Sequence, residues 1–254
     1  MSTPAAAPSS AALLYLFADR VVERDTALSQ KFEVPCTDAA VKQATLAAEL
    51  FAIGFWSLQE QGKLTLSMGK RTLMGMGRQQ ITASIQPGVD VRPPPQGPQV
   101  VLDVAQLQAS GGLLNMLGNL AQQVPEPAPL EPGQTPFTLE DSTLHLVEFN
   151  GGTAPVRDII QSWFGSDEPN PSYKVIQRVG RELIELGYST GTTGGSLMKT
   201  PTITIDCGRR ASLEGPAIEL LERWAGFRDA PDGLGTTLVD RCRAAISSMQ
   251  ESDE

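Results

Sequence analysis

Hydrophobic residues along this 254-residue chain follow two different spacings, and the first of them predicts helices. Apolar residues recur every three to four positions in residues 10–24 and again in 41–58, as in helices that pack one side against a core. Thr37 or Asp38 is expected to cap the second helix at its start. Gly62 is expected to end it, because glycine readily adopts the left-handed conformation found just after helices.

The second spacing, a period of two, follows Gly62. Residues 64–68 and 81–85 alternate apolar with polar side chains, and three glycines lie between the two stretches. This pattern predicts a β-hairpin. A winged-helix-like unit has this order of elements, with helices followed by a glycine-containing hairpin. The hairpin would be its wing.

The second half of the chain repeats this order. Residues 154–165, APVRDIIQSWFG, predict a helix with Pro155 at its first position. Residues 173–188 predict a stronger helix that ends at Gly187, followed by a glycine-rich turn and a strand. A strand is also expected around His145, and two more helices are expected at about 214–227 and 234–250.

Two proline-rich linkers separate the halves. The expected fold is mainly α with short β-hairpins, and the repeated order allows two winged-helix-like units joined by a proline-rich insert. Within the insert, a short amphipathic helix carrying Leu113 and Leu117 is expected to dock on the protein or on a partner. The expected division is a disordered N-terminus (1–9), a first unit (10–85), the insert (86–136), a second unit (137–250) and an acidic tail (251–254).

Charge and cysteine content indicate the kind of protein. The formal net charge is −9 and the isoelectric point is near 4.7, which argues against general nucleic-acid binding but not against one local basic patch. Three widely spaced cysteines, Cys36, Cys207 and Cys242, fit a reducing compartment better than a disulfide scaffold. No secretory signal is evident, and the longest apolar stretch is shorter than the roughly 20 residues of a spanning helix. We expect a cytoplasmic protein, one that could be peripheral to a membrane.

Residues with catalytic potential are sparse. The single histidine, His145, argues against catalytic triads and histidine–zinc sites, and no phosphate-binding loop occurs. Glu140 with Asp141, and Glu182 with Glu185, are expected on solvated surfaces rather than in a cleft. We therefore expect neither an enzyme nor a cofactor or metal site, although an enzyme without a recognisable motif stays open.

The clearest local asymmetry is the hairpin stretch KLTLSMGKRTLMGMGR, residues 63–78, with four cations and no acid. Such a ribbon could insert an apolar tip into an anionic lipid surface while its cations contact headgroups. It could instead follow nucleic-acid phosphates, or its methionines could pack inward. The residues expected to bind the anion are Lys63, Lys70, Arg71 and Arg78, and those expected to contact a membrane or partner are Met74 and Met76.

A second basic stripe is possible on the helix at 173–188. Lys174, Arg178 and Arg181 lie four and three positions apart, so they share one side of that helix. Glu182 and Glu185 dilute the charge, and the same residues could equally form a salt-bridged surface.

Three stretches resemble the Golgi phosphoprotein family of peripheral membrane proteins: AAELFAIGFWSLQEQGKLTL, TAPVRDIIQSWF and IQRVGRELIELGYS. The resemblance covers under a quarter of the chain and implies a related fold and association with membrane surfaces. The positions that recognise the lipid headgroup in that family fall roughly on Lys42, Phe51, Tyr173 and Ile176. None of the four keeps the expected residue type, so the family's phosphoinositide pocket does not carry over.

These observations predict a non-enzymatic binding module, first of all one that associates peripherally with an anionic membrane surface. The alternative is a winged-helix regulator or adaptor that binds DNA or a protein partner. The acidic isoelectric point disfavours the DNA version more than the protein version.

Overall fold

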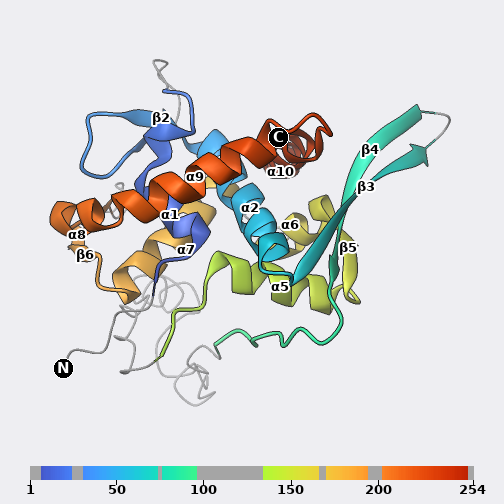
Figure 1. Cartoon of the computed structure of the whole chain (residues 1–254), viewed down its shortest axis with the longest axis horizontal. Helices are drawn as coiled ribbons and strands as arrows, with labels where there is room; N and C mark the ends of the chain where they lie inside the picture. Colours follow the sequence, from blue (N-terminus) through green and yellow to red (C-terminus); the bar gives the residue numbers. More distant parts are fainter. Residues whose placement is uncertain are drawn as a thin grey trace, which may run out of the picture.

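The computed structural model describes residues 7–24, 31–73, 76–95, 134–165, 170–193 and 202–250. The described chain is mainly helical with small antiparallel sheets, as predicted (Figure 1). The predicted insert helix at 99–122 and the acidic tail at 251–254 lie outside the described residues.

Helix α2 (Gln43–Glu60) lies in the middle of the body (Figure 1). Its residues from Leu46 to Leu58 are buried on every side, because the sequence there is apolar with few exceptions. The helices that pack around it are α1 (Ser10–Leu16), α5 (Leu139–Phe149), α7 (Pro171–Glu185) and α10 (Leu234–Gln250). Residues from both predicted units belong to one hydrophobic core.

The N-terminal region differs from prediction. The helix expected over 10–24 ends at Leu16 and continues only as a 3₁₀ turn, η1 (Ala18–Arg20). Two short strands, β1 (Lys31–Glu33) and β2 (Ala40–Lys42), then pair antiparallel. Because 40–42 are extended, α2 starts at Gln43 with Lys42 as its N-cap, and the prediction that Thr37 or Asp38 caps it is wrong.

The predicted hairpin is confirmed. Strands β3 (Leu64–Leu73) and β4 (Met76–Ile85) pair along their whole length and project from the helical body (Figure 1). Gly62 has φ +68° and ends α2, as expected. A third strand, β5 (Thr153–Pro155), pairs with β4, so the sheet combines segments from both halves of the sequence.

The strand predicted around His145 is wrong, because this segment forms helix α5. A capping box starts the helix: the Asp141 amide donates to Thr138 Oγ1 at 3.0 Å, and the Thr138 amide donates to Asp141 Oδ2 at 3.0 Å. These reciprocal bonds favour the helix over the strand that the alternation around His145 suggested.

The remaining elements follow the prediction closely. Helix α6 (Val156–Phe164) has Pro155 as its N-cap rather than at its first position, and Gly187, with φ +76°, follows α7. Strands β6 (Ser189–Thr193) and β7 (Thr202–Ile205) form the second hairpin. The last helices before α10 are α8 (Cys207–Ser212) and α9 (Glu214–Arg228).

Candidate functional site

Strand register places two of the basic residues of the β3–β4 hairpin opposite each other. Arg71 is paired with Arg78, and Lys70 is paired with Gln79. Lys63 precedes β3 and its carbonyl accepts a 3.0 Å hydrogen bond from the Gln86 amide at the hairpin base. No acidic residue occurs between residues 63 and 86. Directly opposite residues of an antiparallel pair share one face, where like charges are destabilising unless something compensates them.

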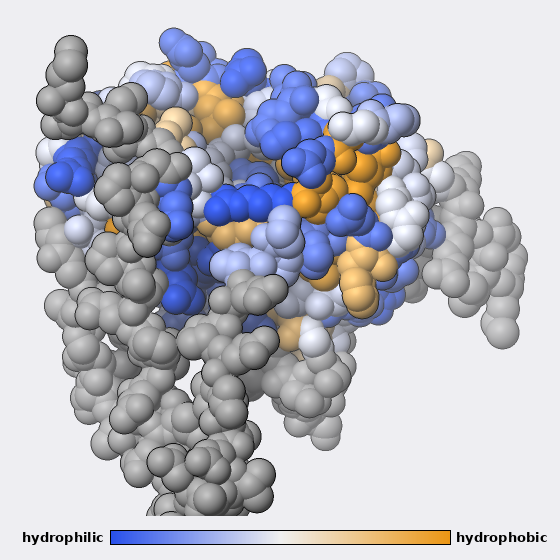
Figure 2. All heavy atoms as spheres, turned by 90° about the horizontal axis from the view of Figure 1, so that it is seen from below, coloured by the Kyte–Doolittle hydropathy of each residue, from blue (hydrophilic) through white to orange (hydrophobic). Residues whose placement is uncertain are grey.

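The apolar residues predicted to contact a membrane or partner are placed only in part. Met76 begins β4 and is paired with Leu73. Met74, Leu113 and Leu117 lie outside the described residues. The large hydrophobic side chains most exposed in the described chain are Met68 on β3, at 38%, and Phe149 at the end of α5, at 79%. On the face seen from below, apolar side chains gather mainly in one area bordered by hydrophilic ones (Figure 2).

The basic residues predicted on α7 are engaged within the protein. Lys174 Nζ donates to the Phe164 carbonyl at 3.3 Å and lies 5.7 Å from the centre of the Trp163 ring. The Arg178 guanidinium lies 5.4 Å from the centre of the Phe137 ring, and burial lowers its pKa. Arg181 pairs with Glu185 at 3.5 Å. The three cations therefore do not form a free stripe, and one of them, Arg181, forms an ion pair with an acid of the same helix.

Two carboxylates predicted to be solvated are buried. Glu182 on α7 is 1% exposed and Glu140 on α5 is 6% exposed. Glu182 accepts from the Ser9 amide at 2.7 Å and from Ser9 Oγ at 2.9 Å. Glu140 Oε1 accepts from the Ala11 amide at 3.2 Å, and its Oε2 is buried without a hydrogen bond in the described chain. Ser9, expected to be disordered, is thus held by an acid from a distant helix.

The shared burial of these acids changes their ionisation. Burial, and then repulsion from Glu140, raise the pKa of Glu182 to about 8, while the bonds from Ser9 oppose the rise. Burial also raises the pKa of Glu140. The half-buried Arg178 favours the charged form of Glu182, but less than burial and Glu140 oppose it. Local sequence gave no sign of this pair, because its members come from helices 42 residues apart in the chain.

A third buried acid, Glu49 on α2, lines a polar cavity of about 780 Å³. Its Oε2 accepts from Trp224 Nε1 at 3.2 Å, and its Oε1 lies 3.7 Å from the Arg228 guanidinium. Burial raises the pKa of Glu49, and Arg228 and Trp224 oppose the rise. The cavity wall holds four cations and four acids, so it selects no single charge; its charged residues are Glu23, Arg24, Lys42, Glu49, Arg228, Asp229, Asp240 and Arg243.

A second cavity, of about 580 Å³, lies between the β1–β2 segment, α7 and β7. Tyr173 and Ile176 line it, two of the four positions that the Golgi phosphoprotein resemblance assigns to headgroup recognition. Phe51 instead packs in the core, with its ring centre 5.4 Å from that of Trp163, and Lys42 lines the larger cavity. The four positions therefore do not meet in one pocket here.

The cysteines correct the expectation drawn from their spacing. Cys36 and Cys207, separated by 171 residues, form a disulfide at the edge of the smaller cavity. Cys242 is a free thiol, buried in the core, and burial raises its pKa. Widely spaced cysteines give no warning of a disulfide that only the tertiary fold brings together.

Three further findings concern His145, metal ligands and helix length in the described ranges. His145 lies on α5, where its Nδ1 is buried without a hydrogen-bond partner in this part of the chain. Within those ranges, no three His, Cys, Asp or Glu residues lie close enough together to hold a metal ion. None of the helices described combines the length and the apolar character needed to cross a bilayer.

Comparisons with protein-family models, with curated proteins and with solved structures found no match to this chain.

Proposed function

We propose that this protein associates peripherally with anionic membrane surfaces through the β3–β4 hairpin. One observation carries the proposal: Arg71 and Arg78 occupy directly opposite register positions in a ribbon that contains no acid. An anion bound at that face would compensate the repulsion between them. In a chain with a net charge of −9, concentrating cations on a projecting element favours contact with an anionic surface there rather than elsewhere.

The hairpin end also has the composition of an interfacial anchor. Leu73 and Met76 are the last register pair, beside the two arginines, and Met68 further down β3 is exposed. Apolar residues next to cations are typical of segments that enter the headgroup region of a bilayer. The resemblance to the Golgi phosphoprotein family supports the same proposal at the level of a general membrane-surface association.

The test is flotation of the purified protein with vesicles of phosphatidylcholine alone and with added phosphatidylserine, at low and physiological salt. We expect binding only to the anionic vesicles, weakened by salt. Arg71→Glu with Arg78→Glu should abolish it. The matched control is Arg209→Glu with Arg223→Glu, which makes the same charge change at exposed positions on α8 and α9.

Equal loss in both double variants would mean that overall charge, and not the hairpin, attracts the protein. Absence of binding to any vesicle would overturn the proposal. The hairpin would then be tested as the wing of a winged-helix regulator, with duplex DNA and with protein partners. A cytoplasmic location also stays a proposal, and the Cys36–Cys207 disulfide removes the cysteine argument that supported it.

A further inference from the structure

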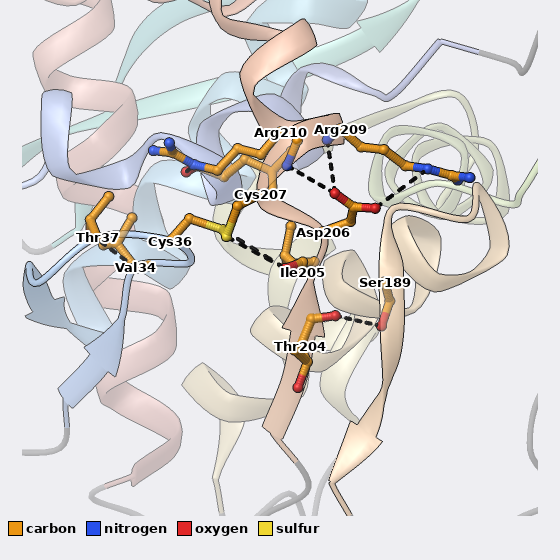
Figure 3. The surroundings of a disulfide bond; sticks show 12 residues. Val34, Cys36, Thr37, Ser189, Thr204, Ile205, Asp206, Cys207, Arg209 and Arg210 are labelled. Carbon is orange, nitrogen blue, oxygen red and sulfur yellow. Dashed lines mark hydrogen bonds and ion pairs between the residues drawn. A yellow bond between two sulfur atoms is a disulfide. The ribbon is translucent and has the colours of Figure 1, made fainter.

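The Cys36–Cys207 disulfide joins two segments that meet only in the tertiary structure. Cys36 lies in the loop between β1 and β2, and Cys207 is the first residue of α8, directly after β7 (Figure 3). Both cysteines are exposed. Their Cα atoms are 5.7 Å apart, and both sulfur atoms lie 3.8 Å from the Ile205 carbonyl oxygen. Exposed disulfides are the ones that thiols reach and reduce most easily.

The loop that carries Cys36 is held in an unfavourable conformation. Cys36 has φ +59°, the single positive value of a residue other than glycine in the described chain. The left-handed region is unfavourable for any residue with a side chain. Val34 and Ala39 on either side are buried, and the Thr37 side chain bonds the Val34 carbonyl at 3.0 Å. The anchored ends and the disulfide together keep Cys36 in this conformation.

The same loop forms one wall of the 580 Å³ cavity, and β7 with α7 forms the opposite wall. A cavity of this size suits a small-molecule ligand. Its apolar lining includes Phe32, Val34, Ile176, Ile203 and Ile205. The two charged residues in the lining, Lys31 and Glu33, have opposite signs, so the cavity favours an uncharged ligand over an anion or a cation.

One lining group is available to a ligand. Tyr15, on α1, lines the cavity and is 3% exposed, with its ring centre 4.8 Å from that of Phe32. Burial raises the pKa of its hydroxyl, which therefore stays a neutral hydrogen-bond donor. Tyr173 also lines the cavity, and its hydroxyl accepts from Gln177 Nε2 at 2.6 Å. Because Tyr15 lines the cavity, its hydroxyl can donate a hydrogen bond to an acceptor on a ligand bound there.

We propose that this cavity binds an uncharged, largely apolar small molecule through an acceptor at the Tyr15 hydroxyl, and that the Cys36–Cys207 disulfide holds the cavity wall in place. Reduction releases the loop from its left-handed conformation. The wall then moves, the cavity loses its shape and the ligand binds more weakly. The disulfide thus couples ligand affinity to the redox state of the surroundings.

The redox step requires a dithiol reductant. One of its thiolates attacks a sulfur of the disulfide, forms a mixed disulfide and displaces the other cysteine as a thiolate. The second thiol of the reductant then breaks the mixed disulfide and displaces the remaining cysteine. The reductant leaves as its own disulfide, and the two cysteines receive its two electrons and two protons. Cys242 takes no part, because it is fully buried.

The ligand site is tested with Nile red, an uncharged aromatic dye that carries carbonyl and ring acceptors. We expect saturable one-to-one binding to the oxidised protein. Tyr15→Phe, which removes only the hydroxyl, should weaken it roughly two- to tenfold, the effect of one hydrogen bond. Tyr188→Phe, outside the cavity, is the matched control and should bind like the original protein. Binding that does not saturate would overturn the proposed ligand site. Equal affinity of the Tyr15→Phe variant and the original protein for the dye would overturn it as well.

The redox coupling is tested by repeating the titration after dithiothreitol treatment, with thiol labelling to verify reduction. We expect affinity to fall roughly five- to thirtyfold, as for a loss of one to two kcal/mol of pre-organisation. Cys36→Ser with Cys207→Ser should bind as weakly as the reduced protein and should not respond to dithiothreitol. Equal affinity of the oxidised and reduced proteins would refute the coupling. Because the cavity and hairpin are separate, neither outcome bears on vesicle binding.

Discussion

Glu140 and Glu182 reach the start of helix α1 from two different helices, and each accepts a hydrogen bond from a backbone amide there. Ser9, the N-cap of α1, contributes both its amide and its hydroxyl to Glu182, and the same hydroxyl accepts from the Ala12 amide at 3.1 Å. The two acids thus attach the N-terminal helix to the rest of the core. They do so with a pair of carboxyl groups that are difficult to ionise together in a buried site.

The pH dependence of stability follows from this pair. The folded pKa of Glu182, about 8, lies above its ordinary value of 4.5, so the protonated form is favoured by folding. Its stabilising contribution is present below about pH 4.5 and is lost as the pH rises through about 8. We expect the free energy of unfolding in urea to fall by about 2 kcal/mol or more between pH 5 and pH 9.

Glu182→Gln should remove most of that pH dependence, because an amide keeps an acceptor for Ser9 but does not ionise. Glu185→Gln is the control, since Glu185 lies on the same helix and forms an ion pair with Arg181. If the two variants show the same pH dependence as the original protein, the acid pair does not determine it.

Ser9→Ala should destabilise the protein by about 1–2 kcal/mol, because it removes both the α1 cap and a donor to buried Glu182. Ser67→Ala, at an exposed position on β3, should change stability by less than about 0.5 kcal/mol. Urea unfolding at about pH 6 measures both. Stability unchanged in the Ser9 variant would show that the N-terminal contacts contribute nothing.

Two helical glycines should respond oppositely to alanine. A Cβ at Gly235 in α10 would lie 2.5 Å from Arg228 Cα and also meet the Phe227 carbonyl oxygen, so Gly235→Ala should cost about 1–3 kcal/mol. Gly226, exposed in α9, has open space around it, and Gly226→Ala should stabilise by about 0.5–1 kcal/mol. Thermal unfolding measures whether each variant is more or less stable than the original protein. Stabilisation by Gly235→Ala would contradict the close approach of α10 to the end of α9.

Lys70→Glu with Arg71→Glu should leave cooperative unfolding intact, because the hairpin projects from the body (Figure 1). Circular dichroism during urea unfolding measures this. Loss of a cooperative transition would show that this part of the hairpin packs against the protein. That outcome would favour the interpretation in which the methionines pack inward and the cations only solvate the turn.

Met74→Ser with Met76→Ser distinguishes insertion into lipid from contact with phosphates. If the hairpin end enters a bilayer, this variant should bind phosphatidylserine vesicles several-fold more weakly, because two apolar side chains no longer leave water. Salt-dependent binding to duplex DNA, should any occur, would hardly change, because the cations are retained. Vesicle binding equal to that of the original protein would exclude an apolar contribution.

Local sequence determined the elements whose signals lie within a few residues. The change of period after Gly62 predicted the β3–β4 hairpin, because alternation and helical spacing bury side chains in different ways. Helices α7, α9 and α10 followed from apolar periodicity, and the turns at Gly62 and Gly187 followed from the left-handed conformation that glycine allows. The basic character of the hairpin is likewise a property of its sequence alone.

Tertiary structure decided what depends on distant partners. The pairing of β1 with β2 shifted the start of α2. By contrast, the Thr138–Asp141 capping box that favours the helix around His145 is a local signal, and it outweighed the alternation there. Glu140, Glu182 and the Cys36–Cys207 disulfide carry no local signal, because their partners are separated by 42 or more positions in sequence. Burial and pairing across such separations arise only when the helices pack around α2, so these features became visible only in the fold.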